Sequence, residues 1–106
     1  MDGGGLTIND DGAIETVWRR KLNIYACRPG QPETKLGEGK NCTVATVNHQ
    51  NIYAWTNNGN IICSLPDGSQ KIIGKGMLPI LKSTGVGDVF CVWENDKQIE
   101  GHILHV

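Results

Sequence analysis

The chain has 106 residues with ten basic and eleven acidic side chains, which gives a formal net charge of −1. One domain is expected at this length, and the near-neutral charge disfavours binding to nucleic acid or to an anionic membrane surface. No apolar run reaches the ~18–20 residues of a membrane span, and no signal-peptide pattern is visible at the amino end. The 14 glycines are well above the usual share of ~7%, which predicts many tight turns between short strands.

The tryptophans reveal a repeat of about 37 residues. They are spaced by 37 and 38 residues, at Trp18, Trp55 and Trp93. An isoleucine follows each of them by six positions, namely Ile24, Ile61 and Ile99. Between the first two units the 37-residue offset also matches Gly37 with Gly74 and Gly39 with Gly76. We expect the three tryptophans and the three isoleucines to pack between the repeated units.

Each unit is predicted to contain four short strands, because β-branched and aromatic runs alternate with turns rich in glycine, asparagine and proline. The middle unit supplies Cys42–Val47, Asn51–Thr56, Ile61–Ser64 and Gln70–Ile73. The first supplies Leu6–Ile8, Ala13–Arg19, Leu22–Cys27 and Glu33–Leu36. The third supplies Pro79–Lys82, Asp88–Glu94 and Gln98–Val106, and its fourth strand is absent. No stretch keeps a helical period, so helix is not expected.

Four antiparallel strands per unit, with a tryptophan on the second strand, are typical of a β-propeller blade. The expected fold is therefore all-β, with blades at about residues 6–37, 38–74 and 75–106 of an incomplete ring. Residues 1–5 are expected to form a flexible or artificial leader. A closed ring needs ~4–8 blades, so either two copies form a six-bladed ring or the chain is a piece of a longer propeller. We favour the homodimer.

The units resemble the repeat of sialidase-like β-propellers of the BNR or aspartate-box type. The resemblance is carried by Leu36-Gly37-Glu38-Gly39, by Asn51-Ile52-Tyr53-Ala54-Trp55 and by Pro66-Asp67-Gly68. The segments 74–79 and 89–94 repeat the first two of these. The resemblance implies a secreted or periplasmic bacterial protein. For a catalytic member it implies three arginines, a tyrosine nucleophile with a glutamate partner, and an acidic acid/base residue.

The residue inventory favours a non-catalytic module over an enzyme. Two of the three arginines, Arg19 and Arg20, are adjacent, and the two tyrosines lie inside predicted strands. Ser64–Gly68 places its aspartate one residue later than the aspartate-box turn does. No catalytic residue is assigned. We expect a self-associating module that binds a carbohydrate or a protein ligand. The alternatives are a fragment of a sialidase-like glycoside hydrolase propeller and a degenerate propeller segment that binds no ligand.

Two classes of loop gather at one mouth of a propeller channel: those that enter the innermost strand and those that join the second strand to the third. In this chain both classes carry polar side chains suited to hydrogen-bonding a sugar or a polar peptide. The candidate ligand-binding residues are Arg19, Arg20, Asn41, Asn57, Asn58, Asn95 and Asp96. Arg19 and Arg20 are adjacent, so on a strand they would point to opposite faces.

The cysteines and histidines predict no metal site, and no cofactor is expected. The four cysteines lack a C-x-x-C pairing and lie among apolar or small residues, which favours free, buried thiols. They are Cys27, Cys42, Cys63 and Cys91. A disulfide between Cys27 and Cys63, at nearly equivalent places in adjacent units, is the alternative. His102 and His105 would face opposite sides of one strand, and the acidic turn Asn9–Gly12 lacks the spacing of a calcium loop.

Overall fold

A computed structural model of the chain describes residues 4–8, 14–28, 30–84 and 86–105. Every regular element in these ranges is a β-strand and none is a helix, which confirms the all-β prediction. The described part therefore contains no helix long and apolar enough to cross a membrane. The predicted turn Asn9–Gly12 lies outside the described residues.

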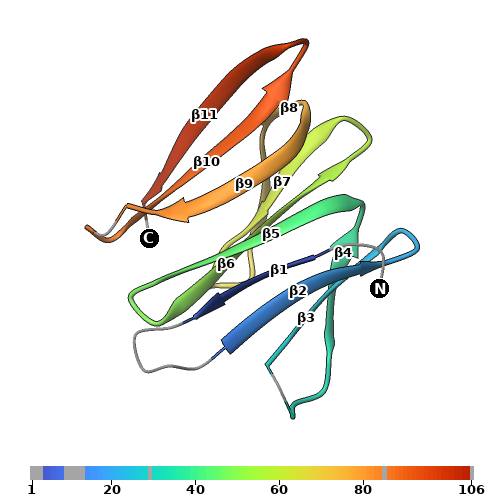
Figure 1. The fold of residues 1–106 in the computed structure, drawn as a ribbon, viewed down its shortest axis with the longest axis vertical. Coiled ribbons are helices and arrows are strands. Elements are labelled where there is room, and N and C mark those ends of the chain that lie inside the picture. Colours follow the sequence, from blue (N-terminus) through green and yellow to red (C-terminus); the bar gives the residue numbers. More distant parts are fainter. Residues whose placement is uncertain (1–3, 9–13, 29, 85, 106) are drawn as a thin grey trace.

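Eleven strands of the described chain form three antiparallel sheets, each with its strands in sequence order (Figure 1). The first sheet contains β1 (Gly4–Ile8), β2 (Ile14–Arg20), β3 (Asn23–Cys27) and β4 (Thr34–Glu38). The second contains β5 (Lys40–Val47), β6 (Gln50–Asn57), β7 (Asn60–Ser64) and β8 (Gln70–Lys75). The third contains β9 (Met77–Ser83), β10 (Asp88–Asn95) and β11 (Gln98–His105).

The number and order of these strands agree with the predicted ones, and the third sheet has three strands as expected. The first strand begins earlier than predicted. Gly4 and Gly5 pair with Trp18 and Val17 of β2, so two residues of the expected leader belong to β1.

Short turns join β5 to β6, β6 to β7 and β10 to β11, because residues with positive φ stand between these strands. Asn58 and Gly59 have φ of 53° and 78°, the pattern of a type I′ hairpin between β6 and β7. Positive φ also occurs at Asn48 and His49 between β5 and β6, and at Asp96 and Lys97 between β10 and β11.

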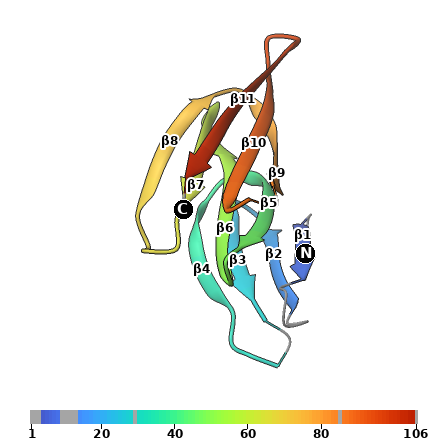
Figure 2. The ribbon, with the colours of Figure 1, turned by 90° about the vertical axis from the view of Figure 1, so that its left-hand side faces the viewer.

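The three sheets stack on one another so that β1 lies beside β5 and β5 beside β9. Figure 2 shows these three strands along one side of the molecule and β4 and β8 along the other. We call β1, β5 and β9 the inner strands. After each of the first two sheets, the chain returns from the outer strand to the inner strand of the next sheet.

A tryptophan packed on glycine lies at each of the two sheet-to-sheet contacts. Trp55 of β6 is buried against the first sheet, where a Cβ added to Gly37 would lie 2.8 Å from its Cζ2 atom. Trp93 of β10 is buried in the same way, and a Cβ added to Gly74 of the second sheet would collide with its Cζ2 atom. Both glycines lie on the outer strand of their sheet, which therefore presents a bare backbone to the indole ring.

Four of the six residues expected between units lie between sheets of this chain. Trp55, Trp93, Ile24 and Ile61 are all buried there. Trp18 points away from the second sheet, because its neighbour Val17 belongs to the core cluster that faces that sheet. Ile99 is 76% exposed on the outer face of the third sheet. Each of these two residues occupies the face of a terminal sheet.

We expect Gly74→Ala to destabilise the fold by about 1–3 kcal/mol, because the new methyl group must displace the buried indole of Trp93. Gly5→Ala is the matched control, since its Cβ would meet only ordinary contacts at 3.9 Å. Urea-unfolding midpoints of the two variants measure the difference. Equal midpoints would show that the indole does not depend on the glycine surface.

Candidate functional site

The starts of the three inner strands line one hollow of about 430 Å³. Gly4 of β1, Asn41 of β5 and Leu78 of β9 all lie on its wall, and they are spaced by 37 residues each. Arg19 of β2 and Cys42 add a guanidinium group and a thiol to the same wall. The repeat therefore brings three equivalent backbone positions together around one space.

The backbone bends in the same way at the starts of β5 and β9, where these strands line the first hollow. Asn41 and Leu78 have φ of 56° and 57°, which places two non-glycine residues in the left-handed region. Two residues before each of them, a glycine N–H donates to the strand-to-strand turn of the preceding sheet: Gly39 to the Leu22 carbonyl at 2.8 Å and Gly76 to the Gly59 carbonyl at 2.9 Å. These bonds fix where each inner strand begins.

A second hollow of about 660 Å³ shares Asn41 with the first. Its polar lining includes the amides of Asn57 and Asn58 and the charged side chains of Glu38 and Lys40. Leu22 and Met77 add apolar surface. Amide groups both donate and accept hydrogen bonds. The two hollows together form a groove whose surface is more apolar than polar and which carries these amide and charged groups.

Four of the seven predicted ligand-binding residues meet at this groove: Arg19, Asn41, Asn57 and Asn58. Arg20 does not, because its guanidinium pairs with Glu33 at 3.2 Å and lies 5.2 Å from the ring centre of Tyr25. Asn95 donates to Glu100 at 3.2 Å from the β10–β11 turn, where Asp96 also lies. Neither of these two lines the groove formed by the described residues.

Arg19 gives the first hollow a fixed positive charge. Its Nη1 atom donates to the Lys21 carbonyl at 2.8 Å, which holds the side chain near the turn between β2 and β3. The nearby thiol of Cys42 has a pKa above its ordinary value because it is partly buried, an effect that the charge of Arg19 opposes. Leu78 and Gly4 were not among the predicted site residues, although the 37-residue offset from Asn41 points to both.

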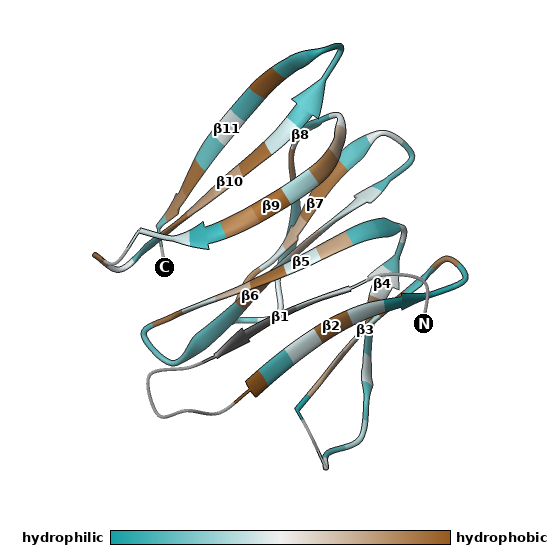
Figure 3. Cartoon of the chain, in the orientation of Figure 1, coloured by the Kyte–Doolittle hydropathy of each residue, from teal (hydrophilic) through white to brown (hydrophobic). Residues whose placement is uncertain are grey.

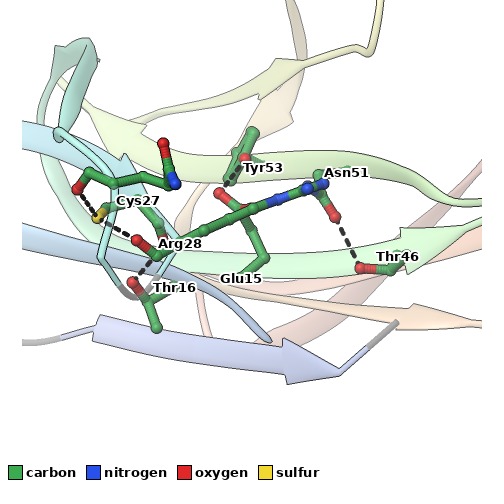
Figure 4. Close-up of polar contacts among 8 residues, drawn as sticks. Glu15, Thr16, Cys27, Arg28, Thr46, Asn51 and Tyr53 are labelled. Carbon is green, nitrogen blue, oxygen red and sulfur yellow. Dashed lines mark hydrogen bonds and ion pairs between the residues drawn. The ribbon is translucent and has the colours of Figure 1, made fainter. Parts of the chain in front are cut away.

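A second polar cluster lies between the first two sheets, and the sequence interpretation did not foresee it (Figure 4). The hydroxyl of Tyr53 donates to Oε1 of Glu15 at 2.8 Å, and Nε of Arg28 donates to Oε2 of the same carboxylate at 3.1 Å. Glu15 is only 5% exposed. The two repeat equivalents of Glu15 are Ile52 and Phe90, so a carboxylate at an otherwise apolar position was the available signal.

Burial is the main reason why the pKa of Tyr53 lies above the ordinary value of tyrosine, and the bond to Glu15 adds to the shift. The carboxylate of Glu15 accepts hydrogen bonds from the hydroxyl of Tyr53 and the guanidinium of Arg28, so each of its two oxygens has a donor. It lies away from the groove. Along β2, Glu15 and Arg19 are four residues apart, or roughly 13 Å at ~3.3 Å per residue.

None of the four cysteines forms a disulfide bond in this structure. Cys63 and Cys91 are buried between the second and third sheets, where burial raises their pKa values to about 11 and about 12. His105 lies 2.9 Å from the carboxylate of Asp88. In the described ranges, no three side chains of His, Cys, Asp or Glu converge as a metal site would require.

No family model, no curated protein and no solved structure matches this chain. A functional assignment therefore depends on the geometry of the groove and on its chemistry.

We expect Leu78→Asn to stabilise the protein by about 1 kcal/mol, because asparagine adopts positive φ at a lower cost than leucine does. The reciprocal change Asn41→Leu should destabilise it by a similar amount at the equivalent position. Urea unfolding of both variants measures the effect. If both changes shift the midpoint in the same direction, backbone strain does not decide these positions.

We expect Tyr53→Phe to cost about 1–3 kcal/mol at pH ~7, because the buried carboxylate of Glu15 loses a donor. In the wild type the folded state keeps the phenolic proton that the unfolded state releases above pH ~10, so stability falls as pH rises through that value. In the Tyr53→Phe variant this contribution to the decrease in stability above pH ~10 should be absent. Urea midpoints on both sides of pH ~10 test it, with Tyr25→Phe as the control at neutral pH.

Proposed function

We propose that the three sheets are blades of a β-propeller and that the chain is a non-catalytic module that binds a carbohydrate in the groove. The observation that carries this proposal is the convergence of Gly4, Asn41 and Leu78 around one hollow. Inner strands that meet around a shared space, with the chain returning from each outer strand to the next inner strand, are the arrangement of propeller blades. Ligands commonly bind in such concave spaces.

The lining suits a carbohydrate because it mixes donors, acceptors and apolar patches. The amides of Asn41, Asn57 and Asn58 can each donate to one sugar hydroxyl and accept from another. Leu22 and Met77, which are 58% and 53% exposed beside them, offer apolar surface to the C–H face of a sugar ring. Arg19 adds a charged donor. A polar peptide would use the same groups, so it is the competing ligand.

The contact between Tyr53 and Glu15 favours a second candidate, the sialidase-like hydrolase, because that resemblance implies a tyrosine with a glutamate partner. Several facts support the non-catalytic proposal instead. Glu15 is nearly inaccessible and already pairs with Arg28. The other two arginines lie elsewhere: Arg19 in the groove, and Arg20 against Glu33 on the opposite face of the sheet.

Glycan-array binding followed by titration of the best glycan tests the function. We expect Arg19→Ala to weaken binding by about 10- to 100-fold, the loss of one hydrogen bond to a charged group. Arg20→Ala is the matched control, because this residue is adjacent and faces away from the groove. It should bind like the wild type.

Three outcomes would contradict the proposal. Equal losses in both variants would place the ligand outside the groove. Binding to an array of polar peptides but to no glycan would change the ligand class. Release of a reporter from a sialoside by the wild type, abolished in Tyr53→Phe, would favour the hydrolase.

A further inference from the structure

The outer face of the third sheet carries large apolar side chains at repeat positions that are buried between sheets elsewhere in the molecule. Ile99 is 76% exposed, whereas its repeat equivalents Ile24 and Ile61 are fully buried between sheets. Phe90 is 38% exposed, whereas its equivalent Ile52 is fully buried. Cross-strand pairing places Phe90 opposite Ile103 and Val92 opposite Ile80, so these side chains share one face. Figure 3 marks the hydrophobic residues of these three strands, those of both faces together, as brown segments.

We call this surface the acceptor face, made of Ile80, Phe90, Val92, Ile99 and Ile103. A glycine opposite Val92 keeps it open: a Cβ added to Gly101 would lie 2.9 Å from Cε1 of Phe90. The ring of Phe90 therefore spreads over the neighbouring strand. By the repeat register, the same face of the first sheet receives Trp55 and the same face of the second sheet receives Trp93.

The outer face of the first sheet carries the third tryptophan. Trp18 stacks on Tyr25 with ring centres 6.3 Å apart, and Ile14 of the same strand is 40% exposed. We call these three residues the donor face. Trp18 pairs with the residue seven positions ahead, as Trp55 and Trp93 do in their own sheets. No sheet in the described part of the chain covers it.

We infer that the donor face of one copy docks on the acceptor face of a second copy. Within the molecule this kind of contact is made twice, by Trp55 and by Trp93, each on the sheet that precedes its own. The proposed contact would be the third of the series and is made between chains. It differs in one respect: the described third sheet has no fourth strand with a glycine under the indole, so Trp18 would pack on the side chains of the acceptor face. The inference rests on the proposed blade fold.

Two copies are enough to close the ring. Each copy has one donor face and one acceptor face, so a twofold axis repeats the same contact twice and leaves neither face open. Two copies supply six sheets, within the range of ~4–8 that propellers use, whereas three copies would supply nine. Closure also brings a second set of inner-strand starts to the axis, so the ligand groove is half of a larger site.

The oligomeric state, measured by light scattering over a range of concentrations, tests the inference. The wild type is expected at twice the monomer mass of 11.5 kDa. Ile99→Lys should dissociate the dimer at the acceptor face, and Trp18→Glu should do so at the donor face. Ile72→Lys is the matched control, because Ile72 is 60% exposed on β8 and belongs to neither face. It should remain dimeric.

Mixing the two dissociated variants gives the sharpest result. The Ile99→Lys chain keeps its donor face and the Trp18→Glu chain keeps its acceptor face, so the mixture recovers one intact contact and forms a heterodimer. A contact between two identical patches would recover nothing. Circular dichroism of each variant alone checks that the monomers are folded.

The outcomes separate this inference from the proposed function. A wild type that is strictly monomeric at high micromolar concentration overturns the docking, even if it binds a glycan. Open-ended assemblies overturn the closed pair. A dimer that binds no glycan leaves the docking in place and overturns only the proposed ligand.

Discussion

The fold depends on the packing of an indole ring against bare backbone. Two sheets approach closely only because Gly37 and Gly74 leave room for Trp55 and Trp93. A Cβ at either glycine would occupy the volume of the ring, and the sheets would have to separate. Since the glycine lies on the outer strand of one sheet and the tryptophan on the second strand of the next, this contact sets how consecutive sheets stack. The position of the inner strands, and hence of the groove, follows from it.

The strands were predictable from local sequence, and their exact limits were not. Runs such as Ile52–Trp55 favour strands wherever they occur, and Asn58-Gly59 determines a hairpin with few alternatives. The start of β1 at Gly4 is different, because glycine has little intrinsic preference for a strand. Its pairing with Trp18 is a tertiary interaction, so no local pattern could place it.

The sequence predicted which loops lie at the same end of the sheets, and this was enough to predict part of the candidate site. Asn41, Asn57 and Asn58 converge for that reason. Arg20 lies away from the groove, because which way a strand residue faces depends on its register, and its partner Glu33 directly precedes β4. The cluster of Glu15, Tyr53 and Arg28 joins residues from two sheets. Only the stacking of those sheets creates it.

Gly37 and Gly74 couple the local unfolding of each outer strand to the sheet that follows it. Both lie on outer strands that are hydrogen-bonded along one edge, and each is covered by the indole of the following sheet. A cooperative unit of unfolding therefore does not coincide with a sheet, because it includes the outer strand of one sheet and the tryptophan-bearing strand of the next. Loss of the third sheet would uncover β8, whereas loss of the first sheet would leave β8 under Trp93. Local unfolding thus has a direction along the chain, with each outer strand protected from amide exchange by the sheet that follows it.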